Sequence, residues 1–365
     1  MRIRLLFSLF LLVAFPVSAE VIADLYSADV PVTDQGAATR AAAMKDALGQ
    51  VLVKITGSSA MLEHPVAATL LAKPDRYLQQ YRYVAIDPPP VDPAAPRLAL
   101  HASFDGRALE DAVRAAGVPL WGRERPRTLV WAALDSRDGR QIAGANDAGS
   151  ISEALQRAAM RRGLPLTLPA MDAEDATRVS FMDIWGTFEE PLLAAAERYA
   201  PDAVLVGAVF AAGGELWGGR WTLLFKGERL RFETSGASAE AVAIAAVDEL
   251  AERYAERFAV SAPLGGEGTI TVEISNVRDL RDYAAVQKYL AGLSVVENAQ
   301  VLEVRNDTLR MALAINATSR ALEQTIALGR VLEPETRQQE VIVPLGEFAG
   351  IDFAADRTLY YRYRR

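Results

Sequence analysis

The sequence predicts a protein of the α/β and α+β classes, built from several small modules that follow one another along the chain. Strand and helix periodicities alternate through the middle of the sequence, which is typical of a sheet covered by helices. A glycine-rich stretch, Pro263 to Gly268, then precedes a second alternating pattern. The chain has 365 residues, of which 51% are hydrophobic. This is enough apolar material for about two or three domains.

The first nineteen residues have the pattern of a secretory signal peptide. Arg2 and Arg4 make the start positive, Leu5 to Phe15 form an apolar run, and small residues follow at Val17-Ser18-Ala19. The apolar run is too short to span a bilayer. We therefore expect residues 1–19 to be removed and the mature chain to be exported, to the periplasm of a bacterium. The cleavage site has no cysteine, so a lipid anchor is not expected.

An amino-terminal strand-helix module is expected over residues 20–122. Apolar residues from Met44 to Ile55 recur at helical spacing. Thr33 and Asp34 are suited to cap that helix, and Gly57 is suited to end it. The other elements expected here are strands from Ile22 to Val32 and Leu98 to Phe104, and a helix from Leu109 to Ala116.

A central three-layer α/β module with a mixed sheet is expected over residues 123–262. Apolar strands that alternate with helices indicate parallel pairing, and glycine turns late in this region indicate an antiparallel edge. Ser150 with Glu153, and Thr187 with Glu190, stand at capping-box spacing and predict two helix starts. The expected strands are Thr128 to Leu134, Leu164 to Ala170, Ala203 to Phe210, Trp221 to Phe225 and Leu230 to Glu233.

A carboxy-terminal ferredoxin-like module is expected over residues 268–335, because its elements follow the order β-α-β-β-α-β. Residues 336–365 are expected to be a frayed, solvated tail, although Arg357 to Arg365 concentrate arginine and tyrosine. The strands expected in the module are Thr269 to Ser275, Gln300 to Val304, Leu309 to Ile315 and Val331 to Leu332.

The composition argues against several function classes. The net charge of −8 becomes about −10 once Arg2 and Arg4 leave with the signal peptide, so nucleic acid is not an expected partner. The chain has no cysteine, and its two histidines, His64 and His101, lie far apart, so we expect neither a metal site nor a cofactor. A Gly-x-Ser-x-Gly elbow and a Walker-type phosphate loop are absent from the sequence. We therefore expect a protein that is not an enzyme.

Two groups of side chains are candidates for contact with a ligand or partner. Asp172, Asp175 and the later Asp183 could bind a hard cation or act as acid and base, but helix capping and solvation are the favoured interpretation. Trp217 and Trp221 flank two glycines in an expected hairpin. They could stack on a sugar or a partner, but packing in the core is favoured.

Several longer motifs, spread over nearly the whole mature chain, carry a resemblance to a known family. They are Asp29 to Val32 with Arg40 to Met44, Val51 to Gly57, Leu168 to Asp175, Asp183 to Trp185, Glu197 to Ala200 and Trp217 to Trp221. On these motifs the chain resembles an uncharacterised bacterial envelope family, domain of unknown function 2066. That family has no assigned activity, so the resemblance implies no catalytic residues.

Two looser likenesses concern single modules. The strand and alanine-rich helix that end in Val53-Lys54-Ile55-Thr56-Gly57 are similar to the amino-terminal part of flagellar assembly protein T. Tyr199 to Gly207 is similar to the α/β modules of curli-secretion lipoproteins and of penicillin-binding-protein activators. These likenesses imply a non-enzymatic periplasmic factor that assists assembly or activation.

The expected function is that of a periplasmic accessory or scaffold protein that binds other cell-envelope proteins. The alternative is a periplasmic module that binds a small ligand, a glycan or a peptidoglycan fragment near Trp217 and Trp221. No transmembrane segment is expected in the mature chain, and the sequence does not indicate an oligomeric state.

Overall fold

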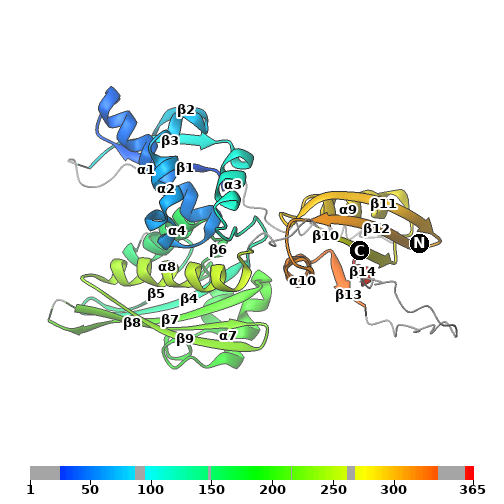
Figure 1. Cartoon of the computed structure of the whole chain (residues 1–365). Coiled ribbons are helices and arrows are strands. Elements are labelled where there is room, and N and C mark those ends of the chain that lie inside the picture. The colour runs from blue at the N-terminus through cyan, green and yellow to red at the C-terminus, as the bar shows by residue number, and fades with distance from the viewer. Residues whose placement is uncertain (1–24, 87–94, 147–148, 215, 261–267, 336–357) are drawn as a thin grey trace, which may run out of the picture.

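The computed structural model describes residues 25–86, 95–146, 149–214, 216–260, 268–335 and 358–365. These residues form three sheets, of three, six and five strands, together with ten α-helices and three short 3-10 helices (Figure 1). The prediction of a chain that mixes helices with several sheets is confirmed. The predicted signal peptide, residues 1–19, and residues 263–267 of the predicted linker lie outside the described residues.

The amino-terminal sheet has three antiparallel strands in the order β1-β3-β2. Its inward side chains, such as Val30 and Leu100, share a buried apolar cluster with Leu48 and Leu52 of helix α1. The helix therefore packs against the sheet through one apolar face. The elements are β1 (Ser27–Val32), α1 (Ala37–Thr56), η1 (Ser59–Glu63), α2 (Pro65–Leu71), η2 (Pro74–Arg76), β2 (Leu78–Ala85), β3 (Leu98–Phe104) and α3 (Gly106–Ala115).

The two ends of α1 compare differently with the prediction. Gly36 is the N-cap, with no side-chain hydrogen bond, so capping by Thr33 or Asp34 was wrong. The Asp34 carboxylate instead accepts a hydrogen bond from the Gly36 N–H at 2.6 Å, in the turn before the helix. The predicted end at Gly57 is confirmed, because this residue takes a left-handed φ of 77° and its N–H donates to the Val53 carbonyl at 2.7 Å.

The central sheet follows the order β5-β4-β7-β8-β9, and the short strand β6 pairs with β4. Strands β6 and β7 run parallel to β4, whereas β8 and β9 pair antiparallel, so the sheet is mixed. The elements are β4 (Thr128–Ser136), β5 (Gly139–Ile142), α4 (Ser150–Arg162), β6 (Leu166–Thr167), α5 (Ala173–Arg178), α6 (Phe181–Trp185), α7 (Glu189–Ala196), η3 (Glu197–Tyr199), β7 (Ala203–Gly213), β8 (Leu216–Phe225), β9 (Glu228–Gly236) and α8 (Ala239–Phe258).

Two separate apolar clusters line the two faces of this sheet. Odd-numbered residues of β7, such as Leu205 and Val209, pack with α4 and α8. The even-numbered Val204 and Val206 pack instead with α6 and α7. Figure 1 accordingly places α4 and α8 above the sheet and α7 below it. The period-2 alternation of a strand is what separates the two clusters.

Neither predicted capping box in this region forms. Gly149 is the N-cap of α4, so Ser150 is its first helical residue. Phe188 is the N-cap of α7, with no side-chain hydrogen bond, and Thr187 has a left-handed φ of 55°. The capping box that does form lies one helix earlier, between Ser180 and Asp183 at the start of α6.

The third sheet follows the order β11-β12-β10-β14-β13. The element order through β13 matches the β-α-β-β-α-β prediction, but β13 does not pair with β10, because β14 stands between them. Strand β14 comes from the predicted tail and runs parallel to β10. The elements are β10 (Gly268–Ser275), α9 (Leu280–Ala291), β11 (Val296–Arg305), β12 (Thr308–Ile315), α10 (Ser319–Leu328), β13 (Leu332–Pro334) and β14 (Thr358–Tyr363).

The prediction of a frayed tail is therefore wrong for residues 358–365. Tyr361 is 4% exposed and belongs to the core of the third sheet, and Leu359 and Tyr363 pack against the same core. These three residues alternate along the strand, so they share one face of the sheet. Arg362, Arg364 and Arg365 lie between or after these residues, and their charges favoured the prediction of a solvated tail.

Candidate interaction surface

The acidic candidates Asp172 and Asp175 converge on one arginine. Arg198 donates from Nη1 to Asp172 and to Asp175, at 2.9 Å each, and from Nη2 to Asp172 at 3.0 Å. Asp175 is fully buried and also accepts hydrogen bonds from the Tyr199 hydroxyl and from the Met171 N–H. Both carboxylates are thus hydrogen-bonded within the protein, and the buried Asp175 has the charged and polar partners that a buried carboxylate requires.

The carboxylates of Asp172 and Asp175 are engaged by donors of the protein itself. The Asp172 side chain accepts from the Asp175 N–H at 3.1 Å and N-caps α5, which confirms the capping interpretation. Asp183 does not join the other two, because it closes the capping box with Ser180. Within the described ranges, no group of three or more histidine, cysteine or carboxylate side chains has the arrangement of a metal site.

Replacing Arg198 by methionine is expected to make the protein more sensitive to acid. The hydrogen bond from Arg198 holds the pKa of Asp172 well below its usual range. A lowered folded-state pKa gives stability that is present above the unfolded pKa of 3.8 and is lost as the pH falls through the folded pKa. Without Arg198, the midpoint of acid unfolding, followed by circular dichroism, shifts to higher pH. Arg178→Met, which removes an exposed pair with Glu174, is the control and leaves the midpoint in place.

Of the two candidate tryptophans, Trp221 is a core residue. It is 1% exposed, stacks on Phe232, and donates from Nε1 to the Thr234 hydroxyl at 2.9 Å. A Cβ added at Gly207 would lie 2.1 Å from its ring, so the neighbouring strand must carry glycine there. Trp217 is half-buried and packs against the same core. The pair therefore does not form a platform on which a sugar could stack.

A second group of aromatic rings, which the sequence reading missed, is half-exposed beside α6. Phe181 stacks on Trp185 with ring centroids 5.3 Å apart, and Trp185 meets Phe210 edge-on at 6.2 Å. The guanidinium of Arg140 lies 5.2 Å from the Phe181 ring, and that of Arg220 lies 5.6 Å from the rings of Trp185 and Phe210. The two arginines thus lie at distances typical of cation–π pairs with these rings.

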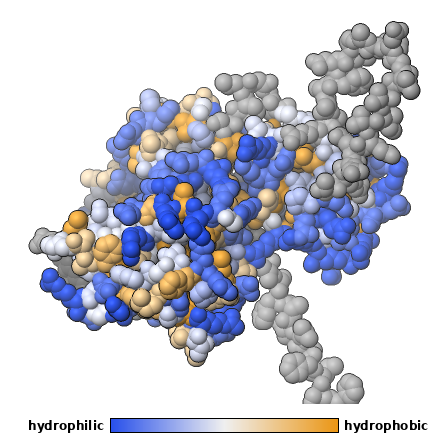
Figure 2. Space-filling view, turned by 90° about the horizontal axis from the view of Figure 1, so that it is seen from below, coloured by the Kyte–Doolittle hydropathy of each residue, from blue (hydrophilic) through white to orange (hydrophobic). Residues whose placement is uncertain are grey.

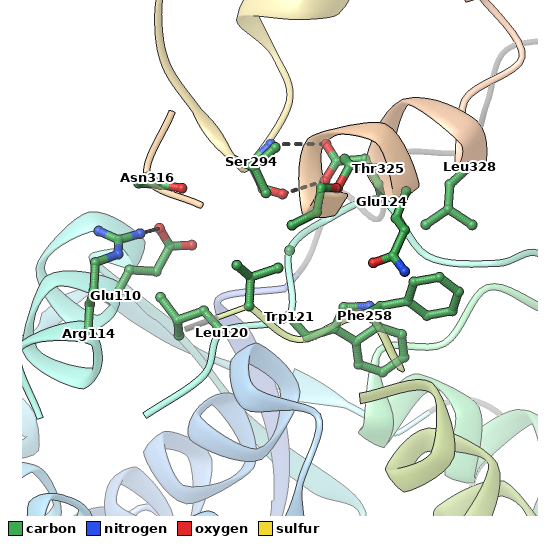
Figure 3. A pocket seen from close by; sticks show the side chains of 15 residues that line it. Glu110, Arg114, Leu120, Trp121, Glu124, Phe258, Ser294, Asn316, Thr325 and Leu328 are labelled. Carbon is green, nitrogen blue, oxygen red and sulfur yellow. Dashed lines mark hydrogen bonds and ion pairs between the residues drawn. The ribbon is translucent and has the colours of Figure 1, made fainter. Parts of the chain in front are cut away.

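A small crevice is lined by residues of α3, of the segment that follows it, and of α8 and α10 (Figure 3). Trp121, Phe258 and Leu328 contribute to its wall, and the Glu124 carboxylate accepts hydrogen bonds there from the Ser294 hydroxyl at 2.6 Å and N–H at 3.3 Å. The cavity measures about 40 Å³, far less than the roughly 300–1,000 Å³ of a ligand pocket.

The turn between α6 and α7 exposes apolar side chains on an ordered backbone. Phe188, Met182 and Leu193 are 54%, 51% and 44% exposed. Thr187, between the helices, holds a left-handed φ of 55°, which is strained for a β-branched residue. The Thr187 N–H nevertheless donates to the Ile184 carbonyl at 3.1 Å, so the turn is fixed. Met182, Phe188 and Leu193 are named the α6–α7 surface below.

An open groove of about 570 Å³ borders this surface on the side of the β8–β9 turn. Leu193 lines it together with apolar residues of the sheet and with Glu189 and Glu197. Glu197 and the nearby Glu190 are exposed and form no ion pair with another described residue, whereas Glu189 pairs with Arg229. Figure 2 views the molecule from this side and shows hydrophobic surface interspersed with strongly hydrophilic surface. The surface is thus apolar, with the unpaired Glu190 and Glu197 on its α7 side and with Lys226 and Arg229 at the β8–β9 turn across the groove.

The sequence alone gave no clear sign of this surface. Leu193 follows Leu192 in a helical pattern, and Leu192 is fully buried, so the pattern does not reveal that Leu193 faces solvent. The useful signal is the dipeptide Thr187-Phe188, because an aromatic residue directly after a short helix and before an acidic first turn has no regular place in the core.

Comparison with known proteins gives one family match. Residues 19–122 match a family described as a domain of unknown function (DUF8605). A search of curated proteins finds no match to the chain. Across the part of the chain that the structure describes, no helix combines the length and apolar character required to cross a membrane.

The family match corrects the resemblance drawn from the sequence motifs. The matched family is different from domain of unknown function 2066, so that identification is wrong. The looser likenesses to flagellar assembly protein T and to the curli-secretion and penicillin-binding-protein-activator modules gain no support from any match either. Short apolar and alanine-rich motifs such as Val51 to Gly57 are determined by helix packing, and unrelated proteins share them for that reason.

Proposed function

We propose that this chain is a non-enzymatic accessory or scaffold protein of the cell envelope, and that it binds another envelope protein through the α6–α7 surface. The observation that carries the proposal is the exposed Phe188 ring on a strained, fully hydrogen-bonded turn. An exposed aromatic residue on a fixed backbone loses little backbone conformational entropy when a partner buries it. Residues of this kind dominate the binding energy of protein interfaces.

The chemistry of the surface specifies the partner. An apolar pocket on the partner would complement Phe188 and Leu193. Basic side chains around that pocket would complement the unpaired Glu190 and Glu197. The partner in this proposal is therefore a folded envelope protein with a basic rim. The proposed periplasmic location of this chain rests on the signal-peptide pattern of residues 1–19, for which cleavage is expected after Ala19.

The proposal also includes the modular organisation expected from the sequence. In it, residues 20–122 form the amino-terminal module, 123–262 a three-layer α/β module, and 268–335 a ferredoxin-like module that the 336–365 tail completes. Separate hydrophobic clusters in the three sheets support this division. A glycan-binding function lacks comparable support, because Trp221 is buried.

Site-specific photocrosslinking in living cells tests the proposed partner contact. A photoreactive side chain at Leu193 is expected to give adducts of one defined mass, while the same group at Leu280, a largely exposed position on α9, gives none. Phe188→Ala is expected to reduce the Leu193 adduct at least tenfold, the usual effect of removing an interface anchor. Equal adducts at both positions, or an adduct that persists in Phe188→Ala, would contradict the proposal.

A further inference from the structure

Strand β9 is the last strand on one side of the six-stranded sheet, so one side of its backbone has no strand partner among the described residues. It pairs with β8 over nine residues, from Glu228 to Gly236, in a regular register without a bulge. The strand contains no proline. An edge without bulges, prolines or a covering element is open to pairing with one more strand.

The charges on the exposed face of β9 are of both signs. Arg229, Arg231 and Glu233 lie on the face of the sheet opposite α8, because Phe232 between them packs toward α8. Arg229 pairs with Glu189 of α7. Arg231 and Glu233, in contrast, are exposed and form no ion pair with another described residue. One cation and one anion, two residues apart, are therefore available at this edge.

The neighbouring strand β8 does not neutralise these two charges. Arg220 of β8 lies opposite Glu233, but its guanidinium is 5.6 Å from the ring centroids of Trp185 and Phe210 and forms no ion pair with Glu233. Arg231 lies opposite a threonine of β8. A strand that added to the edge would lie on the other side of both residues and could supply the missing partners.

Two-fold symmetry restricts the way in which two copies of β9 can pair. When antiparallel edge strands join two sheets, the two-fold axis is perpendicular to the sheet, and opposing residues come from the same face. Since residues of a strand alternate between faces, an odd-numbered residue must oppose an odd-numbered one. The register in which all nine residues pair is centred on the middle residue, Phe232.

This register satisfies both free charges of each copy. Arg231 lies opposite Glu233 of the second copy, and by symmetry the same pair forms again on the other side of the axis. The other opposing pairs are Glu228 with Gly236, Arg229 with Ser235 and Leu230 with Thr234. Moving the axis by one residue would place Arg231 opposite Arg231, or Glu233 opposite Glu233. The full-length register is thus also the one that the charges favour.

The face of β9 toward α8 is compatible with the same register. Leu230 is 37% exposed and would lie diagonally opposite Phe232 of the second copy, within reach of its ring. Arg253 of α8 lies 5.3 Å from the centroid of the Phe232 ring and pairs with Glu249. The charge nearest the axis on this face is therefore already balanced, and pairing covers the exposed leucine.

We infer that β9 is the interface of a two-fold symmetric dimer of this chain, in which two six-stranded sheets join into one continuous sheet. Backbone hydrogen bonds between the two β9 strands hold the copies together, and the two Arg231–Glu233 pairs select the register. This inference is independent of the proposed function, because the partner is a second copy of the same chain.

Sedimentation equilibrium of the purified chain over a range of concentrations tests the dimer. The unmodified chain is expected to show a reversible dimer. Arg231→Glu and Glu233→Arg are each expected to raise its dissociation constant at least about tenfold, because each opposes like charges at two places in the dimer. Combining the two substitutions exchanges the charges and restores both pairs, so the constant is expected to return to within about threefold of the original.

Arg229→Gln is the matched control on the same face of β9. It removes the pair with Glu189 but lies opposite Ser235 of the second copy, so the dissociation constant is expected to stay unchanged. Far-UV circular dichroism checks that each variant is folded. A monomer at every concentration, a dimer that neither single substitution weakens, or a folded double variant as weak as the single ones would overturn the proposal.

Discussion

Deletion of residues 358–365 is expected to unfold the third module while the central module stays folded. The deletion removes β14, which pairs with β10 over five residues and with β13 over three. It also removes Tyr361 from the core, and loss of a large buried aromatic side chain alone costs about 3–5 kcal/mol. Since whole domains are stable by only about 5–15 kcal/mol, the module is not expected to survive the loss.

The end of the strand is fixed by its arginines. Arg365 donates to Asp282 at 2.7 Å and to Asp279 at 3.0 Å, across the start of α9. This contact lowers the pKa of Asp282 below its usual value. Arg362 reaches Glu335 at 3.2 Å, and the Tyr363 carbonyl accepts from the Asn276 side chain at 2.8 Å. The last eight residues are thus part of the fold.

Hydrogen exchange and tryptophan fluorescence together measure this result. The five tryptophans, Trp121, Trp131, Trp185, Trp217 and Trp221, all precede the third module, so their emission reports on the rest of the protein. In the deletion variant, amides of β10 and β12 are expected to lose protection while tryptophan emission stays native. Tyr361→Ala in the full-length chain is expected to give partial loss of the same protection. Native exchange in both variants would show that β14 is dispensable.

This strand also shows where sequence reasoning reaches its limit. Tyr361 alternates with Leu359 and Tyr363 as a strand requires, but the intervening arginines and the terminal position favoured a solvated tail. Its partner β10 lies more than 80 residues earlier, and no local pattern specifies that pairing. Elements with long apolar periodicity, such as α1 and α8, were predictable because burial of one face determines them.

Only those contacts of the candidate site that join residues close together in the sequence were predictable. Asp172 was read as a helix cap, and the cap forms. Its neutralisation by Arg198 depends on a contact between residues 26 positions apart, which the sequence does not reveal. Thr187 and Glu190 had the spacing of a capping box, but the capping box at Ser180 with Asp183 begins a separate helix and leaves Thr187 in the turn. That local failure coincides with the surface now proposed to bind a partner, as is common at functional sites.

The second large effect is expected from Arg125→Met, at the junction of the first two modules. The Arg125 guanidinium is buried and lies 4.0 Å from the centroid of the Trp121 ring. Its Nη1 donates to the carbonyls of Arg162 at 3.0 Å and Gly163 at 2.9 Å, at the end of α4, and its Nη2 donates to the Lys54 carbonyl near the end of α1. One side chain therefore satisfies the carbonyl ends of two helices.

Methionine fills a similar volume but donates nothing to these carbonyls. Each of these three buried carbonyls costs about 1–3 kcal/mol when it is left without a donor, so the free energy of unfolding is expected to fall by about 3–9 kcal/mol. Burial lowers the pKa of Arg125 to about 9, so the guanidinium is still charged at neutral pH and its hydrogen bonds are the strong, charge-assisted kind. Arg125→Lys is expected to lower the free energy of unfolding by less, because an ammonium keeps the charge and can still donate. Some loss is expected, because the ammonium lacks the planar fork of donors.

Urea unfolding followed by tryptophan fluorescence and by far-UV circular dichroism measures both the loss and the coupling of the modules. In the unmodified chain, Gly57 at the end of α1 packs so closely on Ala255 of α8 that a Cβ added at Gly57 would lie 2.5 Å from the Ala255 Cβ, so the two modules are expected to unfold in one transition. In Arg125→Met, the circular dichroism signal is expected to separate into two transitions. Arg157→Met, which removes an exposed ion pair with Glu153 on α4, is the matched control and changes the free energy by less than about 1 kcal/mol. An unchanged midpoint in Arg125→Met would show that water replaces the guanidinium at these carbonyls, and that apolar packing around Trp121 alone joins the modules.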